Sequence, residues 1–292
     1  MTKPCAAALG FFDGVHTAHL RVLQNAAQYA AAHDMEPAAV TFDRSPKAFI
    51  TGADAPLICT AEERARIMRE EAGISRVIVL PFDAAMRDMD ARAFVENVVL
   101  GTLGAGYCAA GYDYRFGARG AGDAALLRQL CAAHGIPCGI VGCLQEDGEK
   151  ISSTRIRERI AAGDMETAAA LLGRPFSLSG EVIHGKALGR TLGFPTMNLP
   201  VPPELVLPAA GVYVCRVLVA GEWRRAVCNV AHGGRPLCEV HAFGYGGDAY
   251  GRQIRVELLH FVRGMRCFDS PEALARQVDF DKKVALDWFS SR

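Results

Sequence analysis

The first half of the chain alternates between short apolar runs and longer segments in which apolar residues recur with helical spacing. Buried strands are predicted by five apolar runs, at residues 6–11, 38–42, 76–81, 105–111 and 139–142. Helices are predicted by the four segments between them, at residues 17–33, 62–72, 91–100 and 123–134. Strands that alternate with helices predict an α/β fold with a doubly wound parallel sheet, whose ligands bind beyond the carboxyl ends of the strands.

The pattern changes in the second half, where short β-type runs with β-branched and aromatic residues are separated by turns. Two short helices precede the change, at residues 155–162 and 166–172. Strands are then predicted at residues 180–183, 211–219, 223–230, 238–243 and 254–261. This pattern is typical of an antiparallel β-barrel, and a C-terminal helix is predicted at residues 271–289. We therefore expect two domains, at residues 1–168 and 169–292.

Composition and charge narrow the possible functions. The 292 residues include 32 lysines and arginines and 32 aspartates and glutamates, so no net positive charge favours a nucleic-acid partner. No apolar run reaches membrane-spanning length, and the N-terminus does not resemble a signal peptide. The ten cysteines lack metal-binding spacing and indicate free thiols in a reducing cytoplasm. We expect a cytoplasmic protein that acts on small molecules, without a membrane partner; the sequence leaves its oligomeric state open.

A glycine-rich segment in the second half carries the clearest candidate chemistry. Gly185, Gly189 and Gly193 recur at even spacing and let the backbone approach a ligand closely, because glycine lacks a Cβ. Lys186 and Arg190 lie between them, and two cations in such a loop suit phosphate groups. The alternative interpretation is a glycine-rich hairpin with two surface cations.

Oxygen-bearing side chains follow this segment. Thr196 and Asn198 are two residues apart, so on an extended strand both side chains point the same way. A hydroxyl and an amide oxygen are hard ligands that suit Mg²⁺. Glu239 lies within a predicted strand further along, and an isolated strand glutamate is, on spacing alone, most often solvated.

The first strand of the chain leads into a pair of histidines. His16 and His19 are three residues apart at the start of the first predicted helix, so both imidazoles lie on one helix face. A helix N-terminus adds backbone N–H donors and the positive end of the helix dipole, and together these suit the phosphates of a nucleotide. The alternative is that the histidines only cap the helix.

Aspartates follow two other predicted strands of the first half. Asp43 lies within the stretch TFDRSP, which could also be a plain strand-end turn. Asp113 precedes Tyr114 and Phe116, whose rings could stack on a ligand or pack in the core.

The segment between the two halves has hydroxyl and guanidinium groups at a helix start. It reads ISSTRIR, and Ser153, Thr154 and Arg157 together can bind a triphosphate. Ser153 or Thr154 could instead serve as the N-cap of the helix, and the two roles are compatible.

Two of these segments resemble known families. Residues 184–200, HGKALGRTLGFPTMNLP, resemble the signature of riboflavin kinase. Residues 10–20, GFFDGVHTAHL, resemble the HxGH nucleotidyltransferases, in particular the FAD synthetase half of the bacterial bifunctional riboflavin kinase/FAD synthetase family. The resemblance extends in order over nearly the whole chain. It implies a bifunctional enzyme that phosphorylates riboflavin to FMN with ATP and adenylylates FMN to FAD, with release of pyrophosphate.

The resemblance also implies roles for the candidate residues. In the kinase domain, Thr196 and Asn198 would hold Mg²⁺ and the ATP phosphates, and Glu239 would remove the proton of the ribityl hydroxyl. The remaining kinase contacts to ATP would come from Gly185, Lys186, Gly189 and Arg190. In the adenylyltransferase domain, His16 and His19 would stabilise charge on the ATP phosphates. The remaining contacts to ATP and FMN would come from Phe12, Asp13, Gly14, Asp43, Asp113, Phe116, Ser153, Thr154 and Arg157.

The chain departs from the family pattern at three positions in the first half. Ala18 stands where the family has glycine, and Arg44 and Ser45 replace proline and histidine. These changes leave two alternatives to the bifunctional enzyme. One is a riboflavin kinase with a decayed adenylyltransferase domain, and the other is a non-catalytic flavin-binding regulator.

Overall fold

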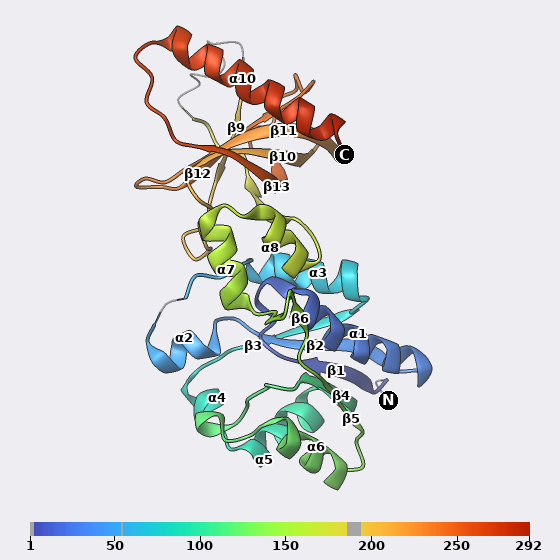
Figure 1. Ribbon diagram of the computed structural model, residues 1–292. Coiled ribbons are helices and arrows are strands. Elements are labelled where there is room, and N and C mark those ends of the chain that lie inside the picture. The colour runs from blue at the N-terminus through green and yellow to red at the C-terminus, as the bar shows by residue number, and fades with distance from the viewer. Residues whose placement is uncertain (1–2, 54, 186–193) are drawn as a thin grey trace. The chain divides into compact units, whose positions relative to one another are not determined.

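The computed structural model describes residues 3–53, 55–185 and 194–292 (Figure 1). The chain divides into two compact units. The first comprises Met1–Ala55 and Thr60–Ser153, and the second comprises Pro56–Cys59 and Thr154–Arg292. Helices α7 (Ser153–Ala162) and α8 (Met165–Leu172) therefore belong almost entirely to the second unit.

The first unit is built on a five-stranded parallel sheet. Its strands follow the order β3-β2-β1-β4-β5. They are β1 (Cys5–Leu9), β2 (Glu36–Phe42), β3 (Arg76–Leu80), β4 (Ala105–Gly111) and β5 (Cys138–Val141). Helices α1 (Thr17–Ala32) and α3 (Ala61–Ala72) pack on one face, and α6 (Ala124–Ala133) packs on the other, so the sheet is doubly wound as predicted.

Both faces of this sheet are buried, and the strand residues alternate between two cores. Ala6 and Ala8 of β1 face the core shared with α1, whereas Ala7 and Leu9 face the core shared with α6. Small residues in the central strand let the helices approach the sheet closely, and burial on both faces explains the continuous apolar runs of the sequence.

Several short elements of the first unit were not predicted. They are α2 (Pro46–Thr51), α4 (Ala84–Asp88), the hairpin β6 (Gln145–Glu146) and β7 (Glu149–Lys150), and 3₁₀ turns at Asp13–Val15 and Ala118–Gly120. The helix predicted at residues 91–100 is one turn of α-helix, α5 (Ala91–Ala93), followed by a π-helical segment, Phe94–Thr102.

The second unit is a six-stranded antiparallel sheet that closes almost completely into a barrel. Its strands follow the order β8-β13-β10-β11-β12-β9. They are β8 (Phe176–Glu181), β9 (Met197–Pro200), β10 (Gly211–Val219), β11 (Glu222–Ala231), β12 (Leu237–Ala242) and β13 (Gln253–Gly264). A bridge between Ile183 and Asn198 joins the chain after β8 to β9, which brings the two edge strands together. The predicted barrel is confirmed, although β9 was not predicted as a strand.

The long C-terminal helix α10 (Pro271–Ser290) covers one face of this barrel (Figure 1). Val212 and Val214 of β10 and Val227 of β11 pack with Ala285 of the helix. Ser270 caps the helix by accepting a hydrogen bond from the Ala273 N–H at 3.1 Å. The apolar contact with β10 and β11 holds α10 against the barrel.

Candidate functional sites

A cavity of 380 Å³ lies in the first unit, beside the carboxyl ends of its parallel strands. This is the place where open α/β sheets bind ligands. Its walls come from the loop after β1, the start of α1, the ends of β2 and β4, and the segment after β7. Among the lining residues are Phe12, His16, Ala18, His19, Ser45, Asp113, Lys150 and Ser153.

His16 is buried, with 4% of its surface exposed, and forms the N-cap of α1. Its Nδ1 accepts a hydrogen bond from the His19 N–H at 3.3 Å, so a proton on the neutral ring is carried by Nε2. The two imidazole rings stack with centroids 3.6 Å apart. The capping role and the paired placement on one wall of the cavity therefore occur together.

The loop before these histidines has an unusual backbone. Phe12 and Val15 adopt left-handed conformations with φ of 57° and 42°, and Gly14 has φ of 74°. Left-handed backbone at a bulky or β-branched residue is strained, and such strain concentrates at functional sites. The Phe12 ring lies edge-on to His19 at 5.3 Å, and the buried Asp13 accepts a hydrogen bond at its backbone carbonyl from Ser153 Oγ at 3.1 Å.

Arg44 and Ser45, the two residues after β2 that depart from the family pattern, have structural roles. Ser45 caps α2, and its Oγ accepts a hydrogen bond from the Ala48 N–H at 3.3 Å. Asp43 accepts a hydrogen bond from the Phe82 N–H at 2.9 Å and pairs with Arg44 at 3.3 Å. Ser45 lines the cavity, whereas Asp43 does not.

Lys150 is a cavity residue that sequence reasoning missed. Its Nζ lies 2.6 Å from Asp113 Oδ2 and 5.1 Å from the centre of the Tyr112 ring. The hydrogen bond with Asp113 raises the pKa of Lys150, so its ammonium stays charged at neutral pH. The sequence around Lys150 has no local pattern that distinguishes a cavity lysine from a solvated one.

The other candidate residues for this site do not line the cavity. Phe116 is 6% exposed and packs against Phe94, with ring centroids 5.4 Å apart, which agrees with the core alternative. Asp13 and Gly14 shape the loop but do not line the cavity. Thr154 and Arg157 belong to the second unit, where Arg157 Nε donates to the Pro56 carbonyl at 2.6 Å.

In the second unit, three polar side chains form a row across three adjacent strands. Glu239 of β12 is directly opposite Asn198 of β9 on one side and Asn229 of β11 on the other. The Asn229 amide nitrogen donates to Glu239 Oε2 at 3.4 Å. With its amide nitrogen facing Glu239, Asn198 donates to Oε1 at 3.3 Å and accepts from the Gly185 N–H at 3.3 Å. The carboxylate is thus held between two amides.

This row lies in the wall of a cavity of 390 Å³ between the barrel and α10. Much of the remaining lining is apolar and comes from Phe194, Val212, Val227, Met265, Phe268, Leu274 and Val278. Arg263, Arg266 and Asp281 also line the cavity. A lining that combines a carboxylate with many apolar side chains suits an amphipathic ligand that has a polar chain and a flat ring system.

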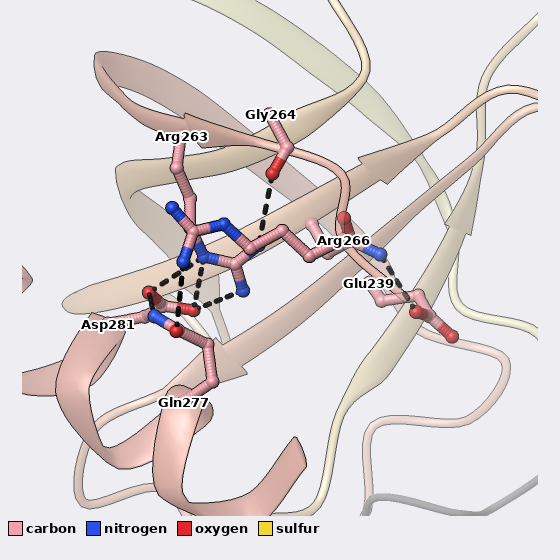
Figure 2. A network of polar contacts seen from close by, with 7 residues as sticks. Glu239, Arg263, Gly264, Arg266, Gln277 and Asp281 are labelled. Atoms are coloured by element: carbon pink, nitrogen blue, oxygen red, sulfur yellow. Dashed lines mark hydrogen bonds and ion pairs between the residues drawn. The ribbon is translucent and has the colours of Figure 1, made fainter. Parts of the chain in front are cut away.

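An ion pair holds α10 against the barrel at this cavity (Figure 2). Arg263 Nη2 lies 2.6 Å from Asp281 Oδ2, and the Arg263 Nε donates to Oδ1 of the same carboxylate at 3.0 Å. Gln277 Nε2 also donates to Asp281, at 2.9 Å, and Arg266 reaches Gln277 at 3.4 Å. The side chains of Arg263 and Asp281 are only 13% and 4% exposed.

A smaller cavity of 210 Å³ adjoins the 390 Å³ cavity of the second unit at β9. Thr196 and Asn198 line both cavities, so they form part of the wall between them. The smaller cavity is otherwise lined mainly by the segment at residues 245–250, and the Tyr250 ring stacks on His184 at 3.8 Å.

The contact of the glycine-rich segment with this wall is close. A Cβ at Gly185 would lie 2.7 Å from Asn198 Cγ, so only glycine fits there. Hydroxyl and amide oxygens at Thr196 and Asn198 are the donor type that Mg²⁺ takes together with phosphate oxygens, and the residues therefore fit this ion. The predicted phosphate contacts at Lys186, Gly189 and Arg190 lie outside the described residues.

Comparisons with known proteins identify the family of this chain. A family model described as FAD synthetase matches residues 1–155, and one described as riboflavin kinase matches residues 172–289. A Haemophilus influenzae protein named bifunctional riboflavin kinase/FMN adenylyltransferase is 34% identical over 98% of this chain and 95% of its own length. This chain belongs to the bifunctional riboflavin kinase/FMN adenylyltransferase family. The predicted resemblance is confirmed, whereas the boundary at residues 168/169 stays a prediction.

Further relatives extend the agreement along the chain. An Escherichia coli K12 protein with the same name is 33% identical over 98% of this chain and 93% of its own length. A crystal structure of a Streptococcus pneumoniae protein titled as a macrolide-efflux protein superposes with a TM-score of 0.87 and 31% identity, covering 99% of this chain and 96% of that one. None of the helices in the described residues is long and apolar enough to cross a membrane.

Proposed function

We propose that this chain converts riboflavin to FAD in two reactions at two sites. ATP first phosphorylates the terminal ribityl hydroxyl of riboflavin, which gives FMN and ADP. The FMN phosphate then attacks the α-phosphorus of a second ATP, which gives FAD and pyrophosphate. The observation that carries the proposal is the pair of separate cavities, one within each matched region, with a carboxylate in one and two helix-start histidines in the other.

In the kinase reaction, Glu239 acts as the general base. The ribityl oxygen forms a bond to the γ-phosphorus, the bond between that phosphorus and the bridging oxygen breaks, and the hydroxyl proton passes to Glu239. Asn198 and Asn229 hold the carboxylate from opposite sides, so its orientation is set before substrate binds.

The two adjoining cavities suit the two substrates of this reaction. The larger one receives riboflavin, with its rings against the apolar side chains, and the smaller one receives ATP. Thr196 and Asn198 lie between them, where the γ-phosphate has to be, and these residues would hold Mg²⁺. When bound, the ion would neutralise the charge on the ATP phosphates.

In the adenylyl transfer, the nucleophile needs no general base, because a phosphomonoester with a second pKa of about 6 is largely ionised at neutral pH. His16 instead donates from Nε2 to the phosphates of ATP as pyrophosphate leaves. The N-terminus of α1 and the ammonium of Lys150 add positive charge at the same cavity.

Two separate reactions test the proposal. Purified protein should convert riboflavin to FMN with MgATP, and it should convert supplied FMN to FAD with release of pyrophosphate. The second reaction decides whether Ala18 and Ser45 are tolerated, since its absence would leave the kinase alone. A cytoplasmic location is also part of the proposal, supported by ten cysteines that are all free thiols, and cell fractionation tests it.

A further inference from the structure

Asn229 occupies a place in the kinase cavity that packing alone does not explain. On the face of β11 turned toward α10 it follows Val227, which packs in the apolar core with the helix. Asparagine is disfavoured in strand interiors, and a polar side chain in a partly apolar wall needs hydrogen-bond partners for both ends of its amide. Asn229 has such a partner for one end.

Glu239 fixes the orientation of this amide. The Asn229 nitrogen donates to Glu239 Oε2 at 3.4 Å, and the reverse orientation would place two acceptor oxygens against each other. The amide oxygen, Oδ1, must therefore point away from the carboxylate. It is buried, and within the described parts of the chain no donor forms a hydrogen bond with it.

A buried acceptor without a donor is costly unless a ligand supplies one. We propose that Asn229 Oδ1 accepts a hydrogen bond from a non-terminal hydroxyl of the ribityl chain, so that Asn229 is a substrate-binding residue and determines specificity for a polyol chain. This inference rests on the proposed kinase function. It assigns to one amide two tasks, which are to orient Glu239 and to recognise the substrate.

The choice of a hydroxyl follows from position. Asn229 and Glu239 are directly opposite each other on neighbouring strands. The Cβ atoms of such cross-strand pairs lie about 4.5–5.5 Å apart. A riboflavin whose terminal hydroxyl is at Glu239 therefore places neighbouring chain hydroxyls near Asn229. The other donor of riboflavin, the imide N–H, belongs to the ring system and is several bonds away from the ribityl chain, so in this placement it does not compete for Asn229.

The test combines one substitution with changes in the substrate. FMN-forming kcat and KM are measured for the parent protein and for Asn229→Ala, with riboflavin and with three analogues that each lack one non-terminal ribityl hydroxyl. In the parent protein, one analogue should lose roughly tenfold or more in kcat/KM, because a site built for a hydroxyl rejects a substrate without it. Asn229→Ala should accept riboflavin and that analogue equally well.

Such coupling identifies the hydroxyl, whereas a purely structural role for Asn229 would lower kcat/KM for all four substrates by the same factor. Equal loss for all four overturns the inference. Asn97→Ala, an exposed asparagine of the first unit, is the matched control. Tryptophan fluorescence during denaturant unfolding checks that the second unit of the variant is folded, because both tryptophans, Trp223 and Trp288, lie in that unit. If the parent protein forms no FMN at all, it is the proposed kinase function that fails.

Discussion

Glu239 and Asn198 face each other across two adjacent antiparallel strands, and the Asn198 amide reaches Glu239 Oε1 at 3.3 Å. Asn198 also lines both cavities of the second unit. The candidate base is therefore anchored to the wall across which a phosphoryl group would pass. The first unit has its own cavity and its own polar residues, so the two reactions should respond separately to substitution.

Replacing the base should stop one reaction only. In Glu239→Gln, shape and packing are retained but the side chain no longer accepts a proton, and FMN formation should fall by roughly 10²–10⁴. FAD formation from supplied FMN should stay within twofold of the parent. Glu222→Gln, an exposed strand glutamate of the same unit, is the control for the assay. FMN formation by Glu239→Gln within tenfold of the parent would rule out the assigned role.

The opposite pattern is expected for the histidine pair. His16→Ala removes a donor to the departing pyrophosphate, and FAD formation should drop by about 10²–10³ while FMN formation is spared. The measurement is separation of the flavins after incubation with each substrate in turn. His134→Ala, in the same unit and remote from the cavity, should change neither rate. Loss of both activities in His16→Ala would contradict the division into two sites.

Lys150 should affect binding more than chemistry. Lys150→Ala removes a charge from the wall of the first cavity, so the KM values for ATP or FMN in FAD formation should rise several-fold with kcat little changed. Because its partner Asp113 raises the pKa of Lys150, the ammonium is charged at all pH values up to that raised pKa and is lost only above it. Titration of Lys150 should therefore not change the KM values of the parent protein between about pH 6 and 9.

The KM effect should also weaken with added salt, because the side chains of Lys150 and Asp113 are about half exposed and their field is screened. Steady-state kinetics at two ionic strengths checks this point. A Lys150→Ala variant with unchanged KM values at low salt would exclude an electrostatic role.

The Arg263–Asp281 pair predicts a stability effect confined to the second unit. Asp281→Ala leaves the guanidinium of Arg263 buried without its carboxylate, and the free energy of unfolding should fall by about 3–5 kcal/mol. Both tryptophans of the chain, Trp223 and Trp288, lie in this unit, so tryptophan fluorescence during denaturant unfolding reports on it alone.

The matched control lies on the same helix. Lys282 pairs with the exposed Asp279 at 3.1 Å, and Lys282→Ala should cost no more than about 1 kcal/mol. Equal losses in the two variants would show that the Arg263–Asp281 pair does not hold α10 in place. The KM for riboflavin should rise in Asp281→Ala, because α10 forms one wall of its cavity.

Local patterns were enough to predict the long elements of the fold. The helix at Thr17–Ala32 and the strand at Gly211–Val219 have clear periodicity over many residues. Shorter or irregular elements escaped, each for its own reason. Met197–Pro200 becomes a strand only through pairing with β12, and Phe94–Thr102 follows a π-helical path that a period of 3.6 residues does not describe.

The candidate sites show the same division between local and long-range information. His16 and His19 are neighbours in sequence, so their placement on one wall could be predicted from spacing. The row from Asn198 through Glu239 to Asn229 depends on strand register, and Lys150 meets Asp113 across 37 residues. No local pattern specifies such pairs, and the contacts of Asn229 and Lys150 could be seen only once the fold was known.

One progress curve tests the central claim most directly. Purified protein is incubated with riboflavin and excess MgATP, and the flavins are separated at successive times. The two-site account predicts that FMN rises first and is then consumed as FAD accumulates, with one pyrophosphate released for each FAD. FMN that persists as the final product would contradict the second activity, and unchanged riboflavin would contradict both.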